Sequence, residues 1–179
     1  ARGIDEISAH LGWRPHILYM SPRGKVLSQQ DAKRLAREPG LLILCGHYEG
    51  VDERLLEEYG VEEISVGDYV LTGGELPAMI LTDAVSRMLP GVLSEEVCFT
   101  EESHYSGLLE YPQYTRPEVW RGRPVPEVLL SGHHENIRKW RRGQALAITR
   151  QNRPDLWERL ELTKVDWKLL ETLDETPEF

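Results

Sequence analysis

The sequence predicts an α/β fold with a parallel sheet, followed by a small all-helical domain. Strand-like and helix-like patterns alternate over residues 1–93, as is typical of parallel strands joined by crossover helices. Glycine-bearing turns follow two of these strands, at residues 44–54 and 62–77. Beyond a polar stretch without periodicity, apolar residues recur at helical spacing. We therefore expect an α/β domain at 1–93, a linker at 94–109 and a helical domain at 110–179.

Local signals define the first elements. Residues 4–11 predict a helix, and residues 15–20 predict a strand that ends at the turn 21–24. A capping-box pattern at 28–31 begins a second helix, which stops at the Pro-Gly pair at 39–40.

Two more strands follow. Residues 41–45 are consecutively apolar between turn signals, which is the pattern of a fully buried parallel strand. Residues 52–59 predict a short helix with Gly60 as its C-terminal cap. Residues 63–71 predict a third strand, interrupted at Gly67.

The next helix begins after Gly73 and Gly74 and carries Pro77 in its first turn, where proline is tolerated. Its apolar residues recur at helical spacing and are expected in the core: Leu76, Met79, Ile80, Ala84 and Met88. Leu76, Met79 and Ile80 would fit a subunit interface equally well. Further helices are expected at 133–149, 154–160 and 163–173.

Composition is that of an ordinary globular protein, with 179 residues, 40% of them hydrophobic, and a mean hydropathy of −0.44. No apolar run approaches the roughly 18 residues of a membrane span, and no export leader is apparent, so we expect a cytoplasmic protein. Cys45 and Cys98 are expected to be buried thiols. The six histidines form no metal-ligand spacing, so we predict no structural metal.

Charge is unevenly distributed along the chain. The net charge is −9, yet residues 114–153 hold nine basic and three acidic residues. A local positive surface is what phosphate contact needs, whatever the total charge. An ordinary solvated helix face explains the same charges, and charge alone leaves both interpretations open.

The two glycine turns suggest a pocket walled largely by main chain, because glycine lets a ligand approach the backbone closely. Ligands of open α/β sheets bind at the ends of strands. These features favour an adenosine-like ligand over a metal ion, and the absence of Gly-x-Gly-x-x-Gly argues against a nicotinamide site. The alternative is that the glycines only serve tight turns.

Both turns resemble the bacterial tRNA (guanine-N1)-methyltransferase family, a SPOUT branch of the trefoil-knotted methyltransferases that use S-adenosylmethionine. The runs 107–119, 125–134 and 137–141 match the same family, and the similarity extends from about Tyr19 to Pro154. The resemblance implies a deep trefoil knot, which pattern alone would exclude. It also implies an N-terminally truncated chain, which begins with Ala1 and lacks several dozen residues of the family.

The resemblance further implies the residues that bind the methyl donor. His47 departs from the pattern, because some relatives carry arginine there. The donor-binding residues implied by the match are Tyr19, Pro22, Gly46, Tyr48, Glu49, Ser65, Val66, Gly67, Asp68, Tyr69, Val70, Leu71, Gly73 and Gly74.

The implied reaction is methyl transfer to N1 of the guanosine immediately 3′ of the tRNA anticodon. This nitrogen carries a proton at neutral pH, so the reaction needs a general base, and an electrostatic partner for O6. The match places the arginine at Arg87 and the base at Glu102, where relatives carry aspartate. Read without the family, Arg87 is an ordinary helix-end arginine and Glu102 a solvated linker carboxylate. Magnesium is implied by the resemblance alone.

Arg138, Arg141 and Arg142 share one face of a predicted helix, at i, i+3 and i+4, and Ser131 with Gly132 lies at its start, where free N–H groups can hold a phosphate. We predict that these five residues bind RNA. The family works as a homodimer, with the donor pocket from one subunit and the RNA-binding domain from the other. The alternative function is a non-catalytic RNA-binding module, or an inactive fragment of such an enzyme.

Overall fold

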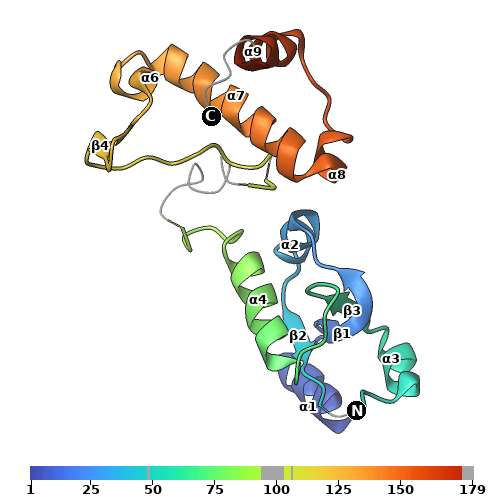
Figure 1. The fold of residues 1–179 in the computed structure, drawn as a ribbon. Helices are drawn as coiled ribbons and strands as arrows, with labels where there is room; N and C mark the ends of the chain where they lie inside the picture. The colour runs from blue at the N-terminus through green and yellow to red at the C-terminus, as the bar shows by residue number, and fades with distance from the viewer. Residues whose placement is uncertain (48, 94–102, 106, 175–179) are drawn as a thin grey trace. The chain divides into compact units, whose positions relative to one another are not determined.

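The computed structural model describes residues 1–47, 49–93, 103–105 and 107–174. The chain divides into two compact units, Ala1–Glu95 and Glu96–Phe179, and each is described by itself (Figure 1).

A three-stranded parallel sheet forms the centre of the first unit. Its strand order is β2-β1-β3, with β1 at His16–Val26, β2 at Leu41–Leu44 and β3 at Glu62–Ser65. The predicted α/β class with a parallel sheet is therefore confirmed. β1 is longer than predicted, because its pairing with β3 resumes at Lys25 after a register shift. The turn signal at 21–24 thus marks an irregularity within the strand instead of its end.

Several end signals of the helices in the first unit lie where they were predicted. α1 spans Arg2–Leu11, and α2 spans Gln29–Leu35 after a capping box in which Ser28 and Asp31 bond each other's backbone N–H. The helix α3, Glu53–Tyr59, is capped by the Asp52 side chain and ends at Gly60. α2 ends four residues before the predicted Pro-Gly stop.

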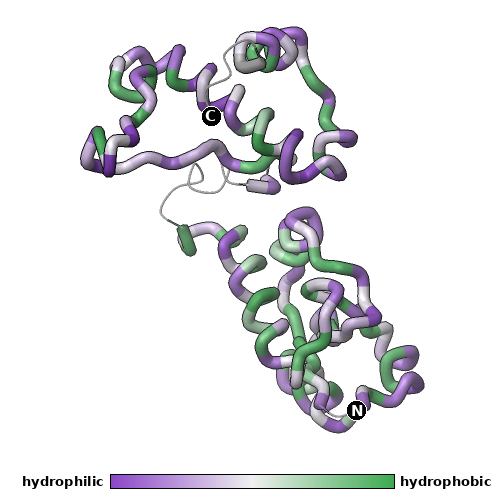
Figure 2. The backbone as a smooth tube through the Cα atoms, viewed as in Figure 1, coloured by the Kyte–Doolittle hydropathy of each residue, from purple (hydrophilic) through white to green (hydrophobic). Residues whose placement is uncertain are grey.

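The core of the first unit lies between the sheet and helices α2 and α4, where α4 spans Glu75–Ser86. Leu81 and Val85 of α4 are buried, but Leu76, Met79 and Ile80 are 57%, 66% and 46% exposed. The core prediction for these three residues is therefore wrong. α4 is apolar around much of its circumference (Figure 2), so periodicity could not select the face that packs on the sheet.

Cys45 is exposed, which corrects the prediction of a buried thiol. It follows β2, and β2 is an edge strand, so the chain is not enclosed between neighbours there. Cys98 lies outside the described residues.

The second unit is built around helix α7, His134–Asn152, with α6 at Glu127–Leu130, α8 at Pro154–Trp157 and α9 at Lys164–Asp174. Its buried hydrophobic cluster comes from α7, α9 and the segment before the helices: Leu108, Ala145, Leu146 and Leu170.

A two-stranded antiparallel ribbon in this unit departs from the all-helical prediction. β4, Val119–Trp120, pairs with β5, Arg123–Pro124. Arg121 and Gly122 between them have positive φ, as a two-residue hairpin turn requires. Strands of two residues are too short to show an alternating pattern in the sequence. Across the part of the chain described here, no helix has both the length and the apolar character of a membrane span.

Candidate functional site

A cavity of about 170 Å³ lies where the chain leaves β2 and β3, beside the middle of β1. We call it the slot. Every described residue of the predicted donor-binding set lines the slot except Gly67 and Asp68, and Tyr48 lies outside the described residues. The lining residues that the sequence did not indicate for this role are Met20, Ser21, His47, Gly50, Ile64, Thr72 and Pro77.

The two glycine turns contact each other directly. The Gly74 N–H donates a hydrogen bond of 3.1 Å to the Gly46 carbonyl. A Cβ on Gly74 would lie 2.7 Å from Cys45 Cα and 2.9 Å from the Gly46 nitrogen. The chain therefore brings its second turn against the first only because residue 74 has no side chain.

The turn after β3 is fixed by its own side chains. The Ser65 hydroxyl donates to the Gly67 carbonyl at 2.9 Å and accepts from the Gly67 N–H at 3.2 Å. The Tyr69 hydroxyl donates to the Val66 carbonyl at 3.1 Å, although Tyr69 itself is exposed. These bonds hold the rim of the slot in place.

A hydrogen-bonded pair of side chains, His47 and Glu75, lies at the slot. His47 Nε2 is 2.6 Å from Glu75 Oε1, and both side chains are more than half exposed. The pKa of Glu75 is lowered by its own backbone N–H and then by His47. The two residues are 28 positions apart, and no local pattern in the sequence links them.

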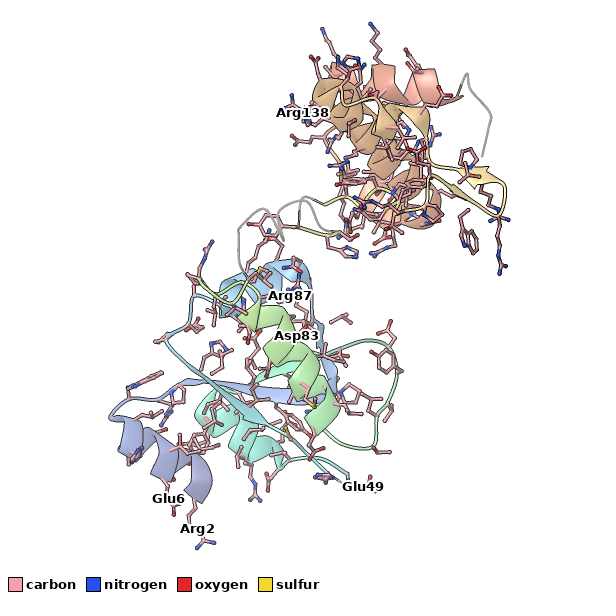
Figure 3. The ribbon with its side chains drawn as sticks, turned by 90° about the vertical axis from the view of Figure 1, so that its left-hand side faces the viewer. Arg2, Glu6, Glu49, Asp83, Arg87 and Arg138 are labelled. Carbon is pink, nitrogen blue, oxygen red and sulfur yellow. The ribbon has the colours of Figure 1, made fainter. Side chains whose placement is uncertain are left out.

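Arg87, the predicted partner of O6, lies away from the slot. It caps the C-terminal end of α4, whereas the slot adjoins the N-terminal end. Twelve residues at 1.5 Å each separate Glu75 from Arg87 by about 18 Å along the helix axis. Figure 3 shows Glu49, a slot residue, and Arg87 at opposite ends of α4. Glu102, the predicted base, lies outside the described residues.

No metal site is apparent in the described residues: none of their His, Cys, Asp and Glu side chains gather in threes or more with geometry that could hold an ion.

The three arginines of the predicted RNA-binding face differ in their surroundings. Arg138 is exposed on α7 (Figure 3). Arg142 forms two hydrogen bonds to the buried carboxylate of Asp166 on α9, at 2.8 and 3.2 Å. The guanidinium of Arg141 lies 4.8 Å from the ring centroid of Tyr111.

Asp166 accepts hydrogen bonds from Thr163 as well as from Arg142. Its carboxylate also accepts from the backbone N–H and the hydroxyl of Thr163. The hydrogen bond from Arg142, followed by the bonds from Thr163, lowers the pKa of Asp166 to about 2, against the opposing effect of burial. The ion pair therefore joins α7 to the start of α9.

The predicted phosphate-binding residues lie between α6 and α7. The Ser131 hydroxyl donates to the Val128 carbonyl at 2.7 Å and accepts from the His133 N–H at 3.2 Å. His133, the N-cap of α7, forms no side-chain cap. Ser131 thus closes the end of α6 and bonds one N–H at the entry to α7.

Comparison with known proteins gives a consistent result. Residues 1–159 match the family described as tRNA (Guanine-1)-methyltransferase TrmD. The tRNA (guanine-N(1)-)-methyltransferase of Ruminiclostridium cellulolyticum is 62% identical over 154 residues, which are 86% of this chain and 66% of that protein. That of Alkaliphilus oremlandii is 58% identical over 160 residues (89% and 64%), and that of Clostridium beijerinckii is 55% identical over 168 residues (93% and 70%).

The chain thus spans about two thirds of the length of these curated relatives. The family match covers both glycine turns, the slot, Arg87 and the basic helix α7. On these matches, the chain belongs to the tRNA (guanine-1)-methyltransferase TrmD family.

Proposed function

We propose that this chain transfers a methyl group from S-adenosylmethionine to N1 of the guanosine immediately 3′ of the tRNA anticodon. The observation that carries the proposal is a cavity at the ends of β2 and β3, lined by residues of both glycine turns, in a member of this family. The names of the relatives support the reaction type.

The slot suits the adenosine part of the donor. Its volume of about 170 Å³ is below the roughly 300–1,000 Å³ of sites that enclose a whole drug-sized ligand, so the adenosine would fill it. Main-chain groups at 65–71 would bond the adenine edge and the ribose, and Gly74 lets the two turns that line the slot pack against each other. When bound, S-adenosylmethionine supplies a methyl group activated by its sulfonium. The donor-binding residues are those that the resemblance implies.

Two charged side chains would act on the acceptor guanine. Glu102 would take the proton from N1 as this nitrogen attacks the methyl carbon. Arg87 would stabilise the negative charge that develops on O6. Because Arg87 lies about 15 Å along the axis of α4 from Pro77, the α4 residue that lines the slot, we propose that a second copy of the chain supplies it.

A homodimer would bring together the slot of one copy and the helical unit of the other. The methyl donor would then bind to one copy and the RNA to the other. The exposed apolar residues near the slot support such an interface: Val70, Leu71, Leu76, Met79 and Ile80. In that arrangement Ser131, Gly132, Arg138, Arg141 and Arg142 would contact tRNA phosphates.

Family membership also supports a deep trefoil knot, and the close contact of the two glycine turns, joined by the hydrogen bond from Gly74 to Gly46, is compatible with one. A tRNA-modifying enzyme would act in the cytoplasm. Magnesium follows from the resemblance alone, and we assign no residue to it.

Mass spectrometry of tRNA nucleosides tests the function. Incubation with this chain and S-adenosylmethionine should produce 1-methylguanosine, and calorimetry should show binding of S-adenosylhomocysteine. RNA binding without either result would favour the second candidate, a non-catalytic RNA-binding module. The separation of Arg87 from the slot is the observation that favours this candidate.

A further inference from the structure

A second cavity lies entirely within the second unit. Its volume of about 400 Å³ falls in the range of small-molecule sites. It lies between the segment 111–118 and helices α6 and α7. We call it the aromatic pocket. The side chains that matter for its chemistry are Tyr111, Tyr114, Arg116, Glu118, Trp140 and Arg141.

Two aromatic rings define the shape of the pocket. The centroids of Tyr114 and Trp140 are 6.1 Å apart, and their planes are tilted by 59°. Rings in this arrangement cannot sandwich a flat group, but one can stack on it while the other contacts its edge. Tyr114 is 43% exposed, so part of its ring is accessible.

A buried donor lies at the same place. The Nε–H of Arg141 is buried and has no hydrogen-bond partner within the described residues, while its guanidinium is held over the ring of Tyr111. Burial of Nε and the contact with Tyr111 fix the Arg141 guanidinium in the wall of the pocket, where a planar donor can bond an acceptor atom of a ligand. Glu118, also in the lining, could accept from an exocyclic amino group.

Flat stacking surfaces combined with an arginine suit an unpaired nucleobase. Proteins that bind single-stranded or looped RNA stack bases on aromatic rings and on guanidinium planes. A fully paired stem would not fit, since its bases are stacked on one another. The basic residues of 114–153 would draw the RNA to this unit.

We propose that the aromatic pocket binds one unpaired nucleobase of the RNA, other than the methyl acceptor. This proposal rests on the proposed function, because it requires RNA as the partner. The base stacks on Tyr114 and meets Trp140 with its edge, the Arg141 guanidinium bonds one of its acceptor atoms, and Arg116 would contact the adjoining phosphate.

The test measures binding of a short RNA hairpin with an unpaired loop to the 179-residue chain, over a range of salt concentrations. Tyr114→Ala should weaken binding about 5- to 150-fold, the effect of losing one base–aromatic stack. Tyr114→Phe keeps the ring and should stay within about twofold of the unchanged chain. The slope of log Kd against log salt should be the same for all, because no phosphate contact is lost.

Trp167→Ala is the matched control, because Trp167 is an exposed aromatic of the same unit that does not line the pocket. It should leave the affinity unchanged. A hairpin carrying 5-iodouridine in its loop should crosslink on irradiation to Tyr114 or Trp140 of the unsubstituted chain, which removes any dependence on how the variants fold. The proposal would be overturned if Tyr114→Ala bound the hairpin as tightly as the unchanged chain, or if Tyr114→Ala and Trp167→Ala lost the same affinity. Crosslinks only to residues other than Tyr114 and Trp140 would also overturn it.

The pocket proposal and the proposed enzyme function can be refuted independently, because different measurements test them. If 1-methylguanosine forms while Tyr114→Ala binds RNA normally, the pocket proposal falls and the function stands. If no 1-methylguanosine forms but Tyr114→Ala loses the hairpin, the pocket stands and the enzyme function falls. A chain that does not bind the hairpin at all overturns the pocket.

Discussion

At residue 74 a single hydrogen atom in place of a side chain decides how the slot is built. The φ and ψ of Gly74, −81° and −7°, are open to any residue, so only space excludes a Cβ. Gly74→Ala should lower the free energy of unfolding by about 1–3 kcal/mol, the cost of overpacking against main chain. The turns would also separate, and S-adenosylhomocysteine should bind more weakly.

Chemical denaturation and calorimetric titration measure the two effects of Gly74→Ala. Gly3→Ala is the control, because a Cβ there meets nothing within 4 Å and the residue lies in α1. Alanine should stabilise that helix by up to about 1 kcal/mol. Equal stability changes for the two variants would contradict the contact that we infer at Gly74.

A single substitution at Glu102 tests its proposed role as the general base. Glu102→Gln keeps the size of the side chain but removes its basicity, so methyl transfer to tRNA should fall about 10²- to 10⁴-fold. Binding of S-adenosylhomocysteine should not change. Glu101→Gln makes the same substitution at the neighbouring residue and should leave the rate of 1-methylguanosine formation unaltered. Normal turnover by Glu102→Gln would remove Glu102 from the mechanism.

Residue pairs show the limit of what the sequence predicts. Glycines after strands indicated where the slot forms, because strand ends of a parallel sheet meet at one edge. The pairs His47–Glu75 and Arg142–Asp166 join residues 28 and 24 positions apart. Such pairs depend on how elements pack, so no local pattern indicates them.

Elements were predictable where local chemistry fixes their ends. The capping box of Ser28 and the Gly60 stop were both found where expected. The face of α4 that packs on the sheet was not predictable, because apolar residues cover much of the circumference of the helix and the sheet alone decides which of them are buried. The ribbon of β4 and β5 was missed because two-residue strands carry no period.

The link between α7 and α9 should make stability depend on pH. The pKa of Asp166 is about 2 in the folded chain, below its ordinary value of 3.8. Its contribution, up to about 2 kcal/mol, is therefore present above pH 4 and is lost as the pH falls from about 4 to about 2. Denaturant titrations from about pH 6 to about pH 2 should show this loss of stability. In Asp166→Asn the stability should fall less over the same pH range. An identical pH dependence for both chains would contradict the role of Asp166.

Substitutions of the α7 arginines should have different effects, because Arg138 and Arg142 have different surroundings. Arg138→Glu should weaken RNA binding and reduce the salt slope by about 1 or more, without lowering the melting temperature. Arg142→Glu should in addition lower the melting temperature, because it places a second carboxylate beside the buried Asp166. Filter binding at several salt concentrations and thermal melts measure both. An unchanged slope for Arg138→Glu would indicate a merely solvated helix face.

At the scale of the whole molecule, two compact units divide the proposed tasks. The slot belongs to the first unit, and the aromatic pocket and the basic helix belong to the second. Each unit has its own buried cluster, so each holds its local site by its own packing. Their sequence signals differ as well: glycine turns indicated the slot, whereas the aromatic pocket is assembled from a loop and two helices that no single motif joins.

Subunit complementation tests whether one site is shared by two chains. Arg87→Ala and a slot variant, Gly74→Val, should each be inactive alone. After mixing and re-equilibration, half of the dimers would be mixed, and each would hold one intact site, made of the slot from one chain and Arg87 from the other. Methyl transfer should therefore recover to about a quarter of the unsubstituted rate. If slot and Arg87 acted within one chain, every mixed dimer would lack an intact site and no activity would return. Met79→Glu, at the exposed apolar face of α4, should abolish this recovery by preventing association.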